Sequence, residues 1–168
     1  MTQQTAKGIT YPESTDNTRL WEHIQTLAED VDGLITVNSN EAEDTASRTT
    51  TSTTYADASG GAFSTTVTVP PSGKVMVAIR TTQRNSGALN TVTSWQAVGS
   101  TSGTVYSAND NAALIWSGSG TTNLSLSLTK RLSGLVAGET LTVTMKHRVS
   151  SASTATIDYR NITVWGLL

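Results

Sequence analysis

The sequence lacks cysteine, and it has only three prolines, one phenylalanine and two histidines among its 168 residues. Without cysteine, neither a disulfide framework nor a thiolate metal site can stabilise the fold, so stability must come from apolar burial and from association. No run of about 18 apolar residues occurs, and no basic, apolar leader opens the chain. We therefore expect neither a membrane span nor Sec export.

Common catalytic patterns are also absent. Neither a G-x-S-x-G elbow nor a phosphate-binding G-x-x-x-x-G-K-[ST] or G-x-G-x-x-G loop occurs. His147 continues the alternation of Val143 and Met145, which favours a buried histidine over a catalytic one. Four carboxylates stand in no context typical of glycoside cleavage: Asp57, Asp110, Glu139 and Asp158. We predict that the chain is not an enzyme and has no metal or cofactor.

A short apolar seam near the N-terminus is the most informative feature that is present. Its members recur at steps of four and three: Leu20, Ile24, Leu27, Val31 and Leu34. This spacing predicts a short coiled-coil helix over residues 16–35, preceded by capping residues. Trp21 widens the stripe, which favours a homotrimer, and His23 falls on the polar flank. The alternative is a single helix packed on its own β domain.

The segments on either side of this helix are polar. Residues 1–15 lack periodicity, and we expect an extended attachment arm in which Ile9, Tyr11 and Pro12 contact a partner; a frayed terminus is the alternative. Residues 36–54 have almost nothing to bury and read as a polar linker or an edge strand. Residues 1–58 carry ten acidic and three basic side chains, whereas residues 59–168 carry three and eight. The two parts therefore face different surroundings, or both simply have solvated faces.

Residues 55–168 show the period-two alternation of half-buried antiparallel strands. Leu124, Leu126 and Leu128 alternate with small polar residues, and residues 75–79 are apolar on both faces. Turn signals separate the runs: PPSG at 70–73, RNSG at 84–87, SGSG at 117–120 and LVAG at 135–138. About eight strands are expected. The fold class is thus mainly β, an antiparallel β-sandwich of the jelly-roll type preceded by the arm and the helix.

Two surface features of the β domain could bind a ligand. Trp95, Tyr106 and Asn109 would contact a host glycan if the domain recognises one, although such aromatics also serve as core. The segment Asn109-Asp110-Asn111 is interpreted as an Asx turn rather than a calcium site. Five basic residues could form a patch for an anionic ligand or only aid solubility: Lys130, Arg131, Lys146, Arg148 and Arg160.

Two stretches of sequence carry a family resemblance. Residues 8–35, GITYPESTDNTRLWEHIQTLAEDVDGLI, resemble the N-terminal pegs of virion proteins from tailed phages of actinobacteria. The runs VTVPPSGKVMVAIR (67–80) and TIDYRNITVWGLL (156–168) are similar in layout to the trimeric jelly-roll heads of phage fibres and of the tumour-necrosis-factor and C1q group. Such heads place their final strand at the threefold centre. This position would explain why the apolar residues Ile162, Val164 and Trp165 lie so close to the C-terminus.

The resemblance implies a structural role. We expect a homotrimeric capsid decoration or head-fibre protein that is anchored to phage capsid or tail proteins by its N-terminal part. Synthesis in the host cytoplasm would be followed by display on the virion surface, and no nucleic acid or membrane partner is expected. The alternative is a minor tail or tail-tip protein that recognises host surface glycan. The short segment between helix and head favours a short spike over a long fibre.

Overall fold

The computed structural model describes residues 3–4, 10–11, 24, 27 and 38–168. The chain divides into a compact unit over 37–167 and a second unit formed by 1–36 with Leu168. In the N-terminal unit, β1 (Gln3–Gln4) pairs antiparallel with β2 (Thr10–Tyr11). Ile24 and Leu27 have helical backbone conformation and exposed side chains.

Most residues predicted for the arm and the helix lie outside the described part of the chain. These are Ile9, Pro12, Leu20, Trp21, Val31 and Leu34. Tyr11 is described only as a strand residue opposite Gln3. The coiled coil and the attachment arm therefore remain predictions.

The 37–167 unit is mainly β. Its elements, in chain order, are β3 (Ser39–Asp44), β4 (Arg48–Thr50), β5 (Phe63–Thr68), β6 (Lys74–Gly99), β7 (Gly103–Tyr106), the 3₁₀ turn η1 (Asp110–Ala112), β8 (Leu114–Ser133), β9 (Thr140–Val149) and β10 (Ala155–Gly166). Because β3 and β4 pair with β10, residues 39–44 and 48–50 are strands of the sandwich.

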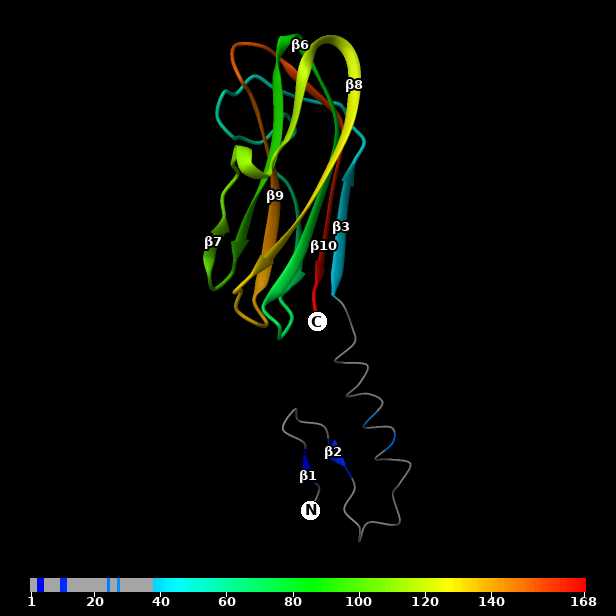
Figure 1. Ribbon diagram of the computed structural model, residues 1–168, viewed down its shortest axis with the longest axis vertical. Coiled ribbons are helices and arrows are strands. Elements are labelled where there is room, and N and C mark those ends of the chain that lie inside the picture. The colour runs from blue at the N-terminus through cyan, green and yellow to red at the C-terminus, as the bar shows by residue number, and fades with distance from the viewer. Residues whose placement is uncertain (1–2, 5–9, 12–23, 25–26, 28–37) are drawn as a thin grey trace. The chain divides into compact units, whose positions relative to one another are not determined.

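The strands form two antiparallel layers that share the long strands β6 and β8 (Figure 1). One layer contains β3 and β4, then β10, the first half of β6 and the second half of β8. The other contains β5, β9, the second half of β6 and the start of β8, with β7 on β6. This pairing forms an antiparallel β-sandwich, which confirms the β part of the predicted fold class.

Two predicted turns are wrong. Residues 84–87 lie within β6 and residues 117–120 within β8, and the two strands stay paired from Lys74 opposite Ser133 to Thr93 opposite Leu114. Their ladder has register shifts near Asn85. Bulges and small residues let a paired ribbon bend from one sheet to the other without ending, so the turn-like composition marks a bend here. The PPSG signal is a true turn, with Gly73 at φ +65° donating from its N–H to Pro70 O.

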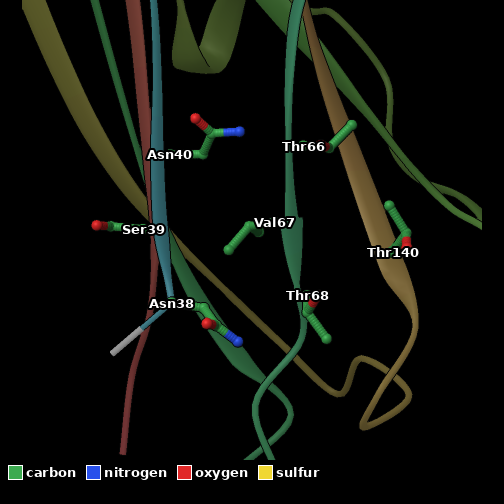
Figure 2. A pocket seen from close by; sticks show the side chains of 7 residues that line it. All are labelled: Asn38, Ser39, Asn40, Thr66, Val67, Thr68 and Thr140. Carbon is green, nitrogen blue, oxygen red and sulfur yellow. The ribbon is translucent and has the colours of Figure 1, made fainter. Parts of the chain in front are cut away.

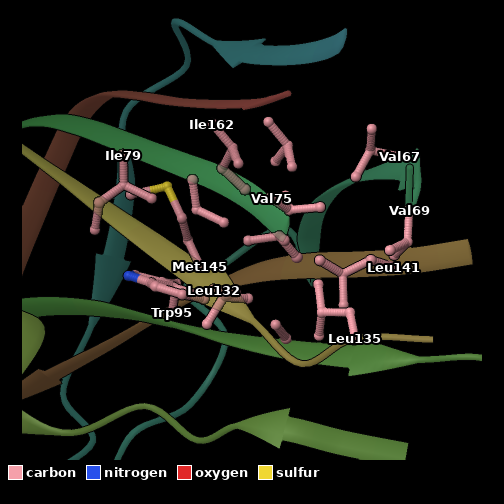
Figure 3. Close-up of a cluster of buried hydrophobic side chains, with 14 of the residues drawn as sticks. Val67, Val69, Val75, Ile79, Trp95, Leu132, Leu135, Leu141, Met145 and Ile162 are labelled. Atoms are coloured by element: carbon pink, nitrogen blue, oxygen red, sulfur yellow. The ribbon is translucent and has the colours of Figure 1, made fainter. Parts of the chain in front are cut away.

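The core combines an apolar part and a polar part. Figure 3 shows the apolar cluster between the sheets, with Trp95 and Met145 among its large side chains. It is built from the inward positions of β5, β6, β8, β9 and β10, as alternation predicts. Further along β6 the inward positions become polar yet stay buried: Thr81, Gln83, Asn85, Thr91 and Thr93.

Candidate functional site

The predicted glycan contacts lie together, but not all at the surface. Trp95 on β6 is fully buried and stacks on Tyr106, with ring centroids 4.1 Å apart. Tyr106 is half-buried, and its hydroxyl accepts a hydrogen bond from Asn109 Nδ2 at 3.0 Å. Trp95 therefore supports the ring of Tyr106 from inside and offers no face to a ligand. The prediction of a glycan site there now rests on Tyr106 and Asn109.

The loop beside Tyr106 is held by its own polar groups. Asn109 Oδ1 accepts from Asn111 N at 3.0 Å, which is the predicted Asx turn. Asp110 accepts two hydrogen bonds from the Arg148 guanidinium, at 2.7 and 3.2 Å, and one from the Tyr55 hydroxyl at 2.6 Å. The Arg148 and Tyr55 hydrogen bonds lower the pKa of Asp110. A carboxylate held in this way is a poor general acid at neutral pH.

The other predicted acid candidates are engaged separately. Asp57 pairs with Lys146 at 2.8 Å, and Asp158 pairs with Arg84 at 3.5 Å. Glu139 is buried and accepts hydrogen bonds from main-chain N–H groups and from Ser102 Oγ. Among the described residues, no cluster of three or more His, Cys, Asp or Glu side chains could hold a metal ion. Each carboxylate has a local structural partner.

Glu139 joins two turns of the sandwich. Its carboxylate accepts from the N–H groups of Thr101 and Ser102 after β6 and from the Val136 N–H before β9, at 3.0 to 3.1 Å. The hydrogen bond from the Ser102 N–H is the largest of several that lower its pKa to about 2. An ionised acceptor suits several convergent donors better than a neutral one does.

Replacing Glu139 by glutamine is expected to lower the midpoint of thermal unfolding, because one carboxylate oxygen is replaced by an NH2 group, which donates and cannot accept the hydrogen bonds made to that oxygen. The change from Asp57 to asparagine is the matched control, since it alters a surface pair. Differential scanning calorimetry compares the two variants. Equal midpoints for Glu139→Gln and the unchanged chain would show that the hydrogen bonds of the Glu139 carboxylate do not stabilise the sandwich.

The predicted basic patch does not form as one surface. Arg160 is buried within the sandwich and pairs with Asp44 at 2.8 Å. Lys146 and Arg148 pair with Asp57 and Asp110, and Lys130 lies 4.7 Å from the centroid of the Tyr106 ring. Most of these charges are therefore locally paired or packed on an aromatic ring. A concentrated site for an anionic ligand would need charges that converge on one place.

The outer face of β6 and β10 carries half-buried apolar side chains. Met76 lies opposite Trp165 in the ladder, and Ala78 lies opposite Thr163. Ile162 and Val164 point the other way and are fully buried by their own chain. The apolar character of these two residues needs no partner subunit, whereas Trp165 and Met76 stay partly exposed on the outer face.

Within the described part of the chain, no helix is long and apolar enough to cross a membrane. No protein-family model matches the sequence, and no curated protein matches it. Among solved structures, the Eiger TNF of S. frugiperda is similar at 12% identity and a TM-score of 0.42, over 79% of this chain and 92% of that one. The enzymatically active domain of bacteriophage CBA120 tailspike protein 4 is similar at 8% identity and a TM-score of 0.33, over 82% of this chain but only 20% of that one.

Proposed function

We propose that this chain is a non-enzymatic structural protein of a phage particle, a homotrimeric capsid decoration or head fibre displayed on the virion surface. The observation that carries the proposal is the division of the chain at residue 36: a self-contained sandwich follows a separate N-terminal segment. That segment holds the peg-like sequence and the apolar seam. Residues 1–35 would then attach to the particle while the sandwich projects.

The chemistry of the sandwich supports a structural role over catalysis. Its buried charged groups are held by local partners, Arg160 by Asp44 and Glu139 by the N–H groups of two turns. Assembly would add avidity, because three weakly attached arms joined by one bundle dissociate more slowly than one arm does. Trp165 and Met76 supply an apolar area that neighbouring heads could share.

The first test is the solution mass of the full chain and of a chain that begins at Val37, measured by light scattering after size exclusion. A trimer of 17.7 kDa chains has a mass of about 53 kDa. We expect the full chain to be trimeric and the shortened chain to keep its β-rich circular dichroism. Truncation further in, at Thr49, would remove β3, so Val37 is the correct boundary. A monomeric full chain would contradict the proposal.

The predicted seam is tested by paired substitutions. Changing Leu20 and Leu27 to aspartate should dissociate the trimer, because two apolar positions per helix that the trimer would bury become charged. Aspartate at His23, on the predicted polar flank, is the control and should leave the mass unchanged. If the double variant stays trimeric, the main interface lies in the sandwich.

Attachment to the particle needs its own measurement. Particles that lack the protein are incubated with the full chain or with the chain that begins at Val37, and the bound protein is quantified after sedimentation. We expect uptake of the full chain only. Equal uptake of both forms would refute the attachment role of residues 1–36.

A glycan-binding tail protein is the second candidate function. Trp95 and Lys130 cover the two faces of the half-buried Tyr106 ring, so a glycan would contact the edge of this ring, the adjoining Asn109 and the Lys130 ammonium. Saturable binding of the full chain to host cells, blocked by soluble glycan, would support this candidate. Normal uptake onto capsids without cell binding would support decoration.

A further inference from the structure

A polar cleft opens between the edge strands β3 and β5, at the place where the two sheets meet without pairing (Figure 2). Its volume is about 310 Å³, near the lower end of the range for small-molecule sites. The walls are Asn38, Ser39 and Asn40 on one side and residues 66–68 with Thr140 on the other. The whole cleft belongs to one chain.

Two amide side chains face the cleft, Asn40 on β3 and Asn38 immediately before it. Asn40 lies opposite the fully buried Val164 of β10, and strand alternation would place an apolar side chain there. In Figure 2 the Asn38 and Asn40 side chains turn towards β5, Val67 turns towards them, and Ser39 points away. The two amides therefore make this edge of the sandwich polar, whereas leucines would make it apolar.

The amides have hydrogen-bonding capacity to spare. Asn40 Oδ1 accepts from the Glu41 N–H at 2.9 Å, while its Nδ2 has no partner among the described residues. The Asn38 side chain likewise has no described partner. An amide nitrogen donates and an amide oxygen accepts, so the pair can bind groups that do both.

The main chain adds further donors and acceptors. Val69 exchanges hydrogen bonds with the segment before β9, so alternation directs the N–H and C=O groups of Thr66 and Thr68 to the free edge of β5. Asn38 O accepts from Gly166 N, which by the same rule directs the main chain of Ser39 and Glu41 to the free edge of β3. Two unpaired strand edges thus flank the cleft.

The lining also limits what the ligand can be. None of the seven lining residues is charged, so an anion or cation would find no counter-charge within it. Cα atoms of β3 and β5 approach within 8 Å of each other, which is less than the space that an inserted strand needs to pair with both edges. A small, neutral, polyhydroxylated molecule fits the lining, and Val67 offers one apolar contact for its C–H face.

We propose that the cleft between β3 and β5 is a binding site for a neutral sugar residue, held by the amides of Asn38 and Asn40 and by the free main-chain edge at Thr66 and Thr68. The site lies apart from Tyr106, and its binding depends neither on trimerisation nor on attachment to a particle. In an assembly, the copies would multiply a weak interaction.

The test titrates the full chain with glucose, galactose, mannose and N-acetylglucosamine, each added separately, and follows its amide signals by NMR. We expect saturable shifts at residues 38–41 and 66–68 with at least one sugar, at a millimolar Kd typical of a single small ligand. Sulfate is titrated in parallel as the charged probe. Shifts with sulfate alone, or with no probe, would overturn the proposal.

Two asparagine variants separate binding from folding. Asn40→Leu should weaken the sugar affinity at least tenfold while the chain stays folded, because leucine suits an inward position opposite Val164. Asn123→Leu, at an exposed asparagine of β8, is the matched control and should bind like the unchanged chain. Unchanged affinity in Asn40→Leu would assign the shifts to another site and refute this one.

Discussion

Replacing Asp44 by alanine is expected to destabilise the sandwich by about 3–5 kcal/mol, the usual cost of removing one partner from a buried ion pair. Arg160 is buried, and its side chain is 4% exposed. It donates to Asp44 Oδ2 from Nε at 3.0 Å and from Nη2 at 2.8 Å. Without this carboxylate, the guanidinium keeps only the Phe63 ring, 4.5 Å away, as a described electrostatic partner.

The surface pair between Lys146 and Asp57 provides the control. The distance from Lys146 Nζ to Asp57 Oδ1 is equally short, at 2.8 Å, but the Asp57 side chain is 36% exposed. We expect Asp57→Ala to cost no more than about 1 kcal/mol. Urea unfolding at neutral pH measures both variants. Similar losses in the two would show that burial does not set the value of the Asp44 pair.

The ionisation of Asp44 also makes the stability of the sandwich depend on pH in the acid range. Burial raises the pKa of this carboxyl, but hydrogen bonds from Arg48, the Ala46 N–H and Arg160 outweigh burial and lower the pKa to about 2. Because the folded value lies below the ordinary value of 3.8, the stabilisation is complete above pH 3.8 and is lost as the pH falls through about 2. The Asp44→Ala variant should not show this contribution to the loss of stability at low pH.

Stability is expected to fall by several kcal/mol between about pH 6.5 and pH 3 because of His147. Its ring is fully buried, and burial, followed by the charge of Arg160, lowers its pKa from 6.5 to about 3. Within that window the unfolded chain takes up a proton that the folded chain does not. Each pH unit therefore lowers the free energy of unfolding by roughly 1 kcal/mol.

The hydrogen bonds around His147 determine which nitrogen carries the proton. Gln83 Nε2 donates to Thr91 O and Leu114 O, so its Oε1 is left to accept from the Thr93 hydroxyl at 2.7 Å. The single hydroxyl proton of Thr93 is thereby used, and His147 Nδ1 must donate to Thr93 Oγ1 at 2.9 Å. Nε2 is then unprotonated, buried and without a described partner, so a second proton there would be an uncompensated charge.

Asparagine at position 147 tests this account. The asparagine amide can still donate to Thr93, but it does not titrate. His147→Asn should therefore be less stable at pH 7, because its side chain is smaller. Its free energy of unfolding should also change less between pH 6.5 and pH 3 than that of the unchanged chain. His23→Asn, at the only other histidine of the sequence, is the control: its free energy of unfolding should change with pH as that of the unchanged chain does. Equal slopes in His147→Asn and the unchanged chain would assign the acid sensitivity to other groups.

Sequence patterns were informative where one face of a strand had to be apolar. Val143 and Met145 predicted that His147 faces inward, and the structure places it there with no exposed surface. Local composition misled at residues 84–87 and 117–120, because glycine, serine and asparagine suit both a tight turn and a bend in a continuing ribbon. Only the pairing of β6 with β8, far apart in sequence, distinguishes the two.

Local patterns in the sequence were enough to predict a mainly β domain of alternating strands, without cysteine or the common catalytic motifs, and an N-terminal segment of helical periodicity. These features follow from local periodicity and composition, which neighbouring residues are enough to express. The environment of each polar or aromatic side chain depends on contacts between strands that are far apart in the sequence. Trp95 is buried and stacks on Tyr106, and Arg160 pairs with Asp44 instead of joining a basic patch. Asn38 and Asn40 lie across a cleft from Thr66 and Thr68. Whether a polar residue is solvated, buried or part of a site depends on which distant strand faces it, and no local pattern records that.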